Sequence, residues 1–300
     1  FAVFVPNALK GEAAQIKITK VKSSFGFGRL IAITSKSPYR KEPICDHFLE
    51  CGGCNLMHMD YQMQLDFKKY RTKETLRKLG RIETKVHDTV GMLSPYYYRN
   101  KAVIPFGEEN GKLIAGLYKT RTHEILDMKR CYIIPKATTD IVKYLKNVFM
   151  ELNIEAYKES TGEGIIRHVV IRNSHKFDDI SITLVTATPK LPRKEILIKK
   201  LVNRYKKIVS IVQNYNPEKN NIILGKKSRV LYGEDFIRDE INGVHFKISH
   251  RSFYQVNPNQ TEELYKKAID YAELTPNDIV IDAYCGIGTI GLSVANYCKT

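Results

Sequence analysis

The sequence lacks a long hydrophobic run, a secretory signal, an internal repeat and a low-complexity linker. No run approaches the ~18 apolar residues of a membrane-spanning helix, and the opening residues do not have a signal-peptide pattern. We therefore expect a cytoplasmic protein with no membrane partner. Acidic residues are also few, since 32 Asp and Glu face 48 Lys and Arg and leave a net charge of +16. This excess favours a polyanionic partner, although a basic proteome or solubility alone would also produce it.

The 300 residues, 43% of them hydrophobic, are enough for two or three domains with cores of their own. The chain begins at Phe1 inside a strand-like run and stops at Thr300, soon after a glycine-rich turn. A doubly wound sheet needs several further βα units after its first glycine turn. We therefore expect a fragment of a longer protein that lacks most of a catalytic domain.

The most informative stretch is 279–292, a short apolar run followed by glycines and a second apolar segment. This pattern predicts a buried parallel strand, a tight turn and a helix N-terminus. Gly286, Gly288 and Gly291 spell the G-x-G-x-x-G of dinucleotide sites. However, an anionic Asp282 would repel a pyrophosphate, whereas it suits the cationic sulfonium of S-adenosylmethionine. We favour S-adenosylmethionine, with a dinucleotide or a purely structural turn as alternatives.

Residues 1–40 predict three short strands, at 1–5, 15–21 and 29–33, and thus a small β-barrel. Eight basic residues and one acidic residue lie between Phe1 and Lys41, so seven of the sixteen excess charges are here. This density favours an oligonucleotide-binding barrel. An ordinary solvated face is the alternative.

Three cysteines follow in one loop at C-x5-C-G-G-C spacing: Cys45, Cys51 and Cys54. The two glycines let the backbone turn tightly and aim amides at sulfur. With a fourth ligand, such a set fits an iron–sulfur cluster or a tetrahedral zinc. Cys131 is the best candidate for that ligand, ahead of His47 and His58. Unligated core cysteines are the alternative, and disulfides are not expected in a cytosolic chain.

The middle of the chain predicts an α+β domain. Its expected elements are a helix capped by Asp60 and ending at Gly80, helices over 138–152 and 192–207, a hairpin of 167–173 with 180–186, a strand over 208–212, and a hairpin of 236–241 with 244–248 turning at Asn242-Gly243. The segment 96–101 interleaves tyrosines with cations, which suits base stacking with phosphate contact or a half-buried strand.

The last motif before the glycine turn is Phe253-x-Gln255-x-Asn257. Asn257 is expected to cap a helix that starts at Pro258. The residues expected on its buried face are Leu264, Ala268, Tyr271 and Ala272. Gln255 then arrives at a domain entrance, either as a ligand-facing amide or as a structural residue.

Taken in order, these motifs resemble the RNA uracil-5-methyltransferase family, in its 23S ribosomal RNA branch. The matching residues are Cys45, Cys51, Cys54, Cys131, Phe253, Gln255, Asn257, Asp282, Tyr284, Cys285, Gly286, Gly288 and Thr289. The resemblance covers essentially the whole chain and implies an α/β and α+β multidomain fold. Its expected parts are a partial OB-like TRAM barrel (1–40), an iron–sulfur α+β domain (41–247) and the start of a Rossmann-like methyltransferase domain (248–300).

The resemblance implies two bound groups. A [4Fe–4S] cluster would be held by the four cysteines, Cys45, Cys51, Cys54 and Cys131. S-adenosylmethionine would contact Gln255 and Tyr284, with Thr289 near it, and these residues join Asp282 and Gly286 of the glycine turn. Phe253 would lie near the target base.

The resemblance also implies a covalent mechanism. In the family, a cysteine thiolate adds to C6 of uracil, C5 takes the methyl group, and a carboxylate removes the C5 proton. Both groups lie beyond Thr300 in the family, so Cys285 and Cys298 are not assigned as the nucleophile and the fragment alone is expected to be inactive. We expect a monomer acting on ribosomal RNA, with transfer RNA as the alternative.

Three other functions are compatible with parts of the pattern. A non-catalytic iron–sulfur module could bind RNA or sense redox state. A dehydrogenase would need an acidic residue ~20 positions beyond the glycine turn, where the chain has ended. Radical cleavage of S-adenosylmethionine uses three cysteines and leaves one iron open, whereas four candidate ligands suggest a closed cluster.

Overall fold

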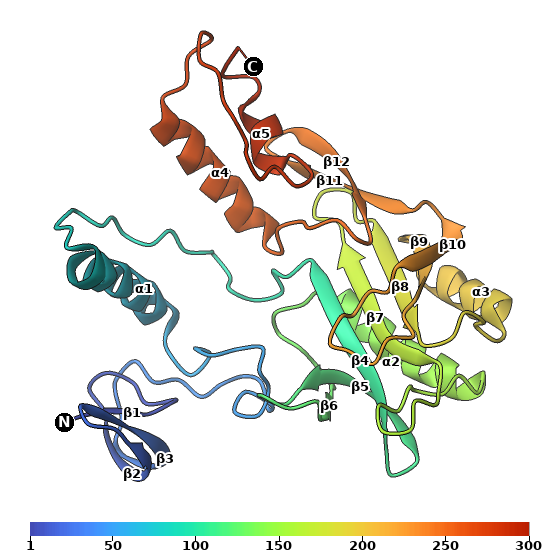
Figure 1. Ribbon diagram of the computed structural model, residues 1–300, viewed down its shortest axis with the longest axis horizontal. Coiled ribbons are helices and arrows are strands. Elements are labelled where there is room, and N and C mark those ends of the chain that lie inside the picture. The colour runs from blue at the N-terminus through green and yellow to red at the C-terminus, as the bar shows by residue number, and fades with distance from the viewer. Residues whose placement is uncertain (300) are drawn as a thin grey trace. The chain divides into compact units, whose positions relative to one another are not determined.

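The computed structural model describes residues 1–299, in two compact units (Figure 1). The first unit is Phe1–Ser94 and the second is Pro95–Thr300, of which Thr300 lies outside the described residues. Each unit is described by itself. Whether the chain divides at 40 and 247, as the sequence suggested, stays a prediction.

A three-stranded sheet begins the first unit. Its strands are β1 (Ala2–Phe4), β2 (Ala13–Val21) and β3 (Phe25–Ser35), in the order β1-β3-β2. The three expected strands are therefore confirmed, with β2 and β3 longer than predicted. They form an open sheet and not a closed barrel, because β1 and β2 lie on opposite sides of β3.

A buried ion pair fastens this sheet to the segment that follows it. The carboxylate of Glu12 is 1% exposed and accepts hydrogen bonds from the Leu9 amide (2.8 Å), the Ser37 amide (3.3 Å) and the Arg40 guanidinium. The hydrogen bond from Arg40 lowers the pKa of Glu12 to about 2. Glu12 is therefore ionised at neutral pH and holds three chain segments together.

One helix completes the regular structure of the first unit. It is α1 (Tyr61–Thr75), and it continues as the π-helical turn η1 (Leu76–Gly80). The predicted cap is confirmed, since Asp60 accepts the Gln62 amide at 2.9 Å. The helical segment ends at Gly80 as predicted, but the cap role expected of Gly80 is wrong, because Arg81 takes the left-handed conformation, with φ of 52°.

The second unit is built on a seven-stranded sheet. Its strands are β4 (Lys101–Glu109), β5 (Lys112–Tyr118), β6 (Ile125–Asp127), β7 (Ile166–Asn173), β8 (Ile180–Thr186), β9 (Ile208–Tyr215) and β10 (Lys227–Gly233), in the order β10-β9-β8-β7-β4-β5-β6. Only the β8–β9 pair is parallel among the pairs within this sheet. Helices α2 (Lys136–Glu151) and α3 (Lys194–Arg204) contribute to the apolar core with these strands (Figure 1).

Most predicted elements of this unit are confirmed. The helix over 138–152, the helix over 192–207, the 167–173 and 180–186 hairpin and the 208–212 strand are all present, with small shifts at their ends. The hairpin of β11 (Phe236–Ile241) and β12 (Val244–Ser249) turns at Asn242 and Gly243, both with positive φ. Such a turn matches the twist of the strands that it joins.

Two short helices follow this hairpin, α4 (Pro258–Ala272) and α5 (Thr289–Val294). The cap of α4 is confirmed, since Asn257 accepts the Gln260 amide at 3.3 Å. Its predicted buried face is wrong. The residues that are buried are Pro258, Thr261 and Tyr265, whereas Leu264, Ala268, Tyr271 and Ala272 are exposed.

The strand predicted over 279–282 is not formed. Ile279 and Ile281 are 72% and 85% exposed, and no strand within residues 1–299 pairs with them. A parallel strand needs a neighbour that is distant in the sequence, so the apolar run alone does not produce one. The Rossmann-like start of the last domain is therefore not confirmed. Across residues 1–299, no helix is both long and apolar enough to cross a membrane.

The Glu12–Arg40 pair makes stability pH-dependent. Because the folded pKa of Glu12 is about 2 and its ordinary value is 4.5, the stabilisation is complete above about pH 4.5 and is lost as the pH falls toward 2. We expect Glu12→Gln to reduce the free energy of unfolding by about 1 to 2 kcal/mol at pH 7 and by much less near pH 2. Urea unfolding followed by circular dichroism measures both values.

Glu74→Gln is the matched control, because Glu74 pairs with Arg77 and Lys78 on an exposed helix face. Its effect at pH 7 should be much smaller than that of Glu12→Gln. Equal effects of the two substitutions, or a Glu12→Gln effect that persists unchanged near pH 2, would contradict the assignment.

Candidate functional site

The glycine turn forms as a turn and a helix N-terminus. Gly286 and Gly288 have φ of 58° and 78°, a region that favours glycine, and Gly288 is the residue before α5. The Asp282 carboxylate accepts the Gly291 amide at 3.2 Å. This carboxylate therefore faces the positive end of the α5 dipole.

The other predicted cofactor residues of this turn differ in exposure. Tyr284 is 99% exposed, whereas the Thr289 hydroxyl lies 2.7 Å from the Tyr265 hydroxyl. Ile287 and Ile290 pack on a small core made by Tyr254, Tyr265 and the β11–β12 hairpin. The turn is thus anchored on one side and open to solvent on the side of Tyr284.

The motif segment 252–256 is held to the large sheet by its main chain. Asn100, which is buried, donates its amide to the Val256 carbonyl at 2.9 Å and its Nδ2 to the Gln255 carbonyl at 3.0 Å. Arg172, at the end of β7, donates its Nη2 to the Ser252 carbonyl at 2.8 Å. We call these three hydrogen bonds the Asn100–Arg172 clamp.

Arg172 is a buried cation. Arg172 is only 2% exposed, and this burial lowers the pKa of its guanidinium to about 10, so the side chain remains charged at neutral pH. Its Nη1 is buried without a hydrogen-bond partner among the described residues. A buried charge is stable only when it is compensated. Asp239 and Tyr254 lie close enough to influence it electrostatically.

Asp239 joins the hairpin to the sheet. It is fully buried, and its Oδ1 accepts the Ser174 hydroxyl (3.1 Å) and the amides of His175 (3.0 Å) and Lys176 (3.1 Å) at the β7–β8 turn. Burial and the neighbouring Asp239 carboxylate raise the pKa of Tyr254. Tyr254 therefore keeps its hydroxyl proton at neutral pH, with Asp239 and Arg172 as its charged neighbours.

The clamp leaves the Phe253 ring exposed at 74%, while the adjacent Tyr254 is buried. The alternation along an extended segment explains this pattern, since successive side chains point in opposite directions. Gln255 is partly buried. The arrangement can present an aromatic surface and a side-chain amide from a rigid support.

The predicted metal ligands are split between the units. Cys45, Cys51 and Cys54 lie partly buried in one loop of the first unit, and Cys131 is buried in the second. The Gly53 amide donates to the Cys51 Sγ at 3.3 Å, as expected for an amide aimed at sulfur. Within residues 1–299, however, no three His, Cys, Asp or Glu side chains are gathered as a metal site. The predicted cluster is therefore not confirmed, and it stays a prediction.

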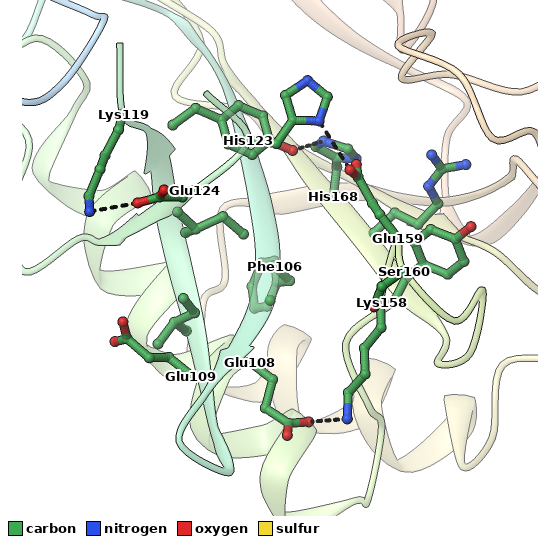
Figure 2. A pocket seen from close by; sticks show the side chains of 16 residues that line it. Phe106, Glu108, Glu109, Lys119, His123, Glu124, Lys158, Glu159, Ser160 and His168 are labelled. Atoms are coloured by element: carbon green, nitrogen blue, oxygen red, sulfur yellow. Dashed lines mark hydrogen bonds and ion pairs between the residues drawn. The ribbon is translucent and has the colours of Figure 1, made fainter. Parts of the chain in front are cut away.

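A polar cavity of about 580 Å³ lies elsewhere in the second unit (Figure 2). It is lined by residues of β4 and β5, by His123, by the 157–160 segment and by His168. None of the predicted site residues lines it. The sequence offered little signal for this cavity, because its lining comes from four separate segments.

The clamp was also missed from the sequence. The 96–101 segment was noted for stacking and phosphate contact, yet Asn100 in it is buried and structural. Its neighbours also bond within the unit, since the amides of Tyr97 and Arg99 donate to the carbonyls of Tyr132 and Ile133, both at 2.8 Å. For Arg172, the sequence signal that a special role was to be expected is a charged residue within the mostly apolar run of β7.

A model of the TRAM domain matches residues 1–31. Over its whole length the chain is 46% identical to an uncharacterized RNA methyltransferase of Listeria innocua and 43% identical to one of Bacillus cereus. The chain spans 66% and 65% of the length of these two relatives. It is therefore similar, from end to end, to proteins named RNA methyltransferases.

One solved structure is also similar. It is the crystal structure of the Pyrococcus abyssi tRNA (uracil-54, C5)-methyltransferase in complex with S-adenosyl-L-homocysteine. The TM-score is 0.73 at 24% sequence identity, and the match covers 98% of this chain and 66% of that one. The two chains therefore share a fold.

The clamp predicts a local change in dynamics when it is broken. We expect Asn100→Ala and Arg172→Met each to raise hydrogen exchange of the 252–256 amides by about fivefold, because each removes one side-chain hydrogen bond of the clamp, worth about 1 kcal/mol. Hydrogen–deuterium exchange with mass spectrometry measures this. Exchange in α2 should change little.

Arg204→Met is the control, since Arg204 lies over the Tyr144 ring on the exposed face of α3. It should leave exchange at 252–256 as in the unsubstituted protein. If both clamp variants also leave it unchanged, the segment is held by other contacts.

Proposed function

We propose that the whole protein transfers a methyl group from S-adenosylmethionine to C5 of a uridine in RNA. The observation that carries this proposal is the similarity, along the entire chain, to proteins named RNA methyltransferases. The ordered motifs narrow the target to uracil C5. The fold shared with a uracil C5 methyltransferase and the TRAM match at residues 1–31 support it.

The residues that would hold S-adenosylmethionine are Gln255, Asp282, Tyr284, Gly286 and Thr289. This molecule supplies a methyl group activated on a cationic sulfonium. The Asp282 carboxylate suits that cation, and Gly286 and Gly288 let the main chain approach closely. The exposed Tyr284 ring offers a stacking surface for an adenine.

Phe253 would contact the target base. Its ring is exposed beside the clamped carbonyls of Ser252 and Gln255, so it is offered to a partner by a fixed main chain. A uridine must leave its stack to be reached by such a site. We assign no nucleophile or base among residues 1–300, and neither Cys285 nor Cys298 is proposed for that role.

We further propose 23S ribosomal RNA as the substrate, because the cysteine motif and a TRAM arm occur together in that branch of the family. Transfer RNA is the second candidate, since the structural neighbour is named for it. That neighbour is 24% identical, so it supports the fold and does not decide between the two RNAs.

Mapping of 5-methyluridine decides both questions. We expect one or more 5-methyluridines to disappear from 23S ribosomal RNA, and none from transfer RNA, when the gene is deleted, as measured by mass spectrometry of nuclease fragments. Restoring the full-length gene should restore them, and a Tyr284→Ala version should restore fewer. Loss from transfer RNA instead would reassign the substrate, and no loss from either RNA would contradict the proposed function.

We also propose that Cys45, Cys51, Cys54 and Cys131 bind a [4Fe–4S] cluster in the whole protein. The spacing and the Gly53 amide directed at Cys51 support this. In this proposal the cluster is structural, and no chemical step depends on it.

Iron content tests the cluster directly. Full-length protein prepared without oxygen should contain about four iron atoms per chain, the content of one such cluster. Cys131→Ala and Cys51→Ala should lose most of it, together with the visible absorbance, because each removes a ligand. Cys298→Ala is the matched control and should keep it. Bound zinc in place of iron, or cluster retention after Cys131→Ala, would contradict the proposed ligand set.

A further inference from the structure

The cavity shown in Figure 2 shares no lining residue with the clamped segment, although strands β4 and β7 connect the two. Asn100, just before β4, binds the 252–256 segment, whereas Phe106 and Gly107 near the other end of β4 line the cavity. At about 3.3 Å per strand residue, Asn100 and Phe106 lie about 20 Å apart along β4, and the clamp residue Arg172 and the cavity residue His168 lie about 13 Å apart along β7. The cavity is therefore a separate site, and its volume of about 580 Å³ is suitable for a small molecule or one nucleotide unit.

Flat side chains form its walls. The rings of Tyr118 and His123 are stacked, with centroids 5.3 Å apart and planes 26° from parallel. Arg167 lies over the Tyr157 ring at 4.7 Å. Arg167 is itself buried, and its Nη1 donates to the carbonyls of Asn216 (2.9 Å) and Glu218 (2.6 Å). The walls are thus planar and held in place.

The charged groups around the cavity are largely committed to partners. Glu108 pairs with Lys158 at 3.1 Å and Glu124 with Lys119 at 2.8 Å, while Glu159 forms a hydrogen bond with His123 at 3.0 Å (Figure 2). Arg167 donates to main-chain carbonyls, and Glu109 also lines the cavity. A metal ion would need a gathered ligand set, of which residues 1–299 contain none. With four glutamates against two lysines and one arginine, the lining disfavours a phosphate and suits a neutral ligand.

His168 indicates that a polar partner is missing. It is more than nine-tenths buried, its Nε2 lies 3.3 Å from the Tyr118 hydroxyl, and its Nδ1 has no hydrogen-bond partner among the described residues. Burial, with Arg167 nearby, lowers the pKa of His168 to about 4, so the ring is neutral at physiological pH. A buried polar atom without a partner calls for a water molecule or a ligand group.

We propose that this cavity binds one unpaired nucleobase of the RNA substrate, stacked on the Tyr118–His123 pair. The proposal rests on the function proposed above and adds a second recognition point to it. A nucleobase is neutral, planar and rich in hydrogen-bonding groups, as these walls require. Proteins read single-stranded RNA largely by stacking splayed-out bases on aromatic side chains. A span of about 13 to 20 Å places that base a few nucleotides from the target uridine.

An abasic scan of the RNA tests the proposal without altering the protein. Single-stranded oligonucleotides that contain the mapped target uridine would each lack one base at a different position, and binding to the full-length protein would be measured by fluorescence anisotropy. We expect the affinity to fall by about 5- to 20-fold at one position away from the target uridine. Bases between that position and the target should matter less.

Three variants link that position to the cavity. His123→Ala should weaken binding of the intact RNA by about 5- to 20-fold and should cause little further loss with the abasic RNA. His123→Phe keeps a ring for stacking and should bind nearly as well as the unsubstituted protein. His245→Ala is the matched control, because His245 also pairs with a glutamate at 2.9 Å and lies edge-on to Phe177, away from the cavity.

Salt dependence separates a base from a phosphate. Because a neutral base releases no counterions, His123→Ala should leave the slope of log affinity against log salt unchanged. A slope reduced by about one would show that the cavity holds a phosphate and would overturn the proposal. So would equal affinities of His123→Ala and His245→Ala together with an abasic scan that is flat away from the target uridine.

The two proposals fail in different ways. Methylation of the target uridine at saturating RNA should be nearly normal in His123→Ala, since this residue lines the separate cavity and makes no contact in the clamp. An unsubstituted protein that makes no 5-methyluridine contradicts the proposed function. A protein that methylates normally and shows none of the predicted binding differences contradicts only the nucleobase cavity.

Discussion

The Asn100–Arg172 clamp is the constraint on which the candidate site depends. Main-chain carbonyls that leave water must find donors, and those of Ser252, Gln255 and Val256 find them in residues of the large sheet. The donors are buried side chains or amides at strand ends, so they cannot follow the segment if it moves. The exposed Phe253 ring is therefore positioned by the sheet and not by its own neighbours in the sequence.

The clamped segment is connected to the glycine turn through helix α4 by a series of short-range hydrogen bonds. The segment ends at Asn257, which caps α4, and the Thr261 hydroxyl donates back to the Asn257 carbonyl at 2.8 Å. One turn further along α4, Tyr265 meets the Thr289 hydroxyl. A displacement of the segment would thus be transmitted to α5. This continuity explains how an exposed turn keeps a defined position relative to the Phe253–Gln255 motif.

The features that could be predicted correctly from the sequence are those determined by contacts within a few residues. Asp60, Asn257 and the Asn242-Gly243 turn were all placed correctly, because a cap or a tight turn is satisfied by neighbours two or three positions away. The predictions were wrong where the structure depends on residues distant in the sequence. The run 279–282 has strand composition but no neighbouring strand within residues 1–299, and α4 buries Thr261 and Tyr265 because the β11–β12 hairpin offers its core to that side. The clamp joins residues 155 positions apart, beyond any local pattern.

In the proposed function, RNA is held by two different kinds of interaction. The excess of sixteen positive charges gives attraction to any phosphate backbone, and this attraction weakens with salt and carries no sequence information. The cavity beside His168 is different in kind, because its two lysines are paired with carboxylates and His168 is neutral. What remains there is shape, stacking and hydrogen bonding, which are the properties that distinguish bases. If the two proposals hold, the basic surface supplies most of the affinity, and the cavity, about 13 to 20 Å from the clamped segment, determines which stretch of the strand lies over Phe253.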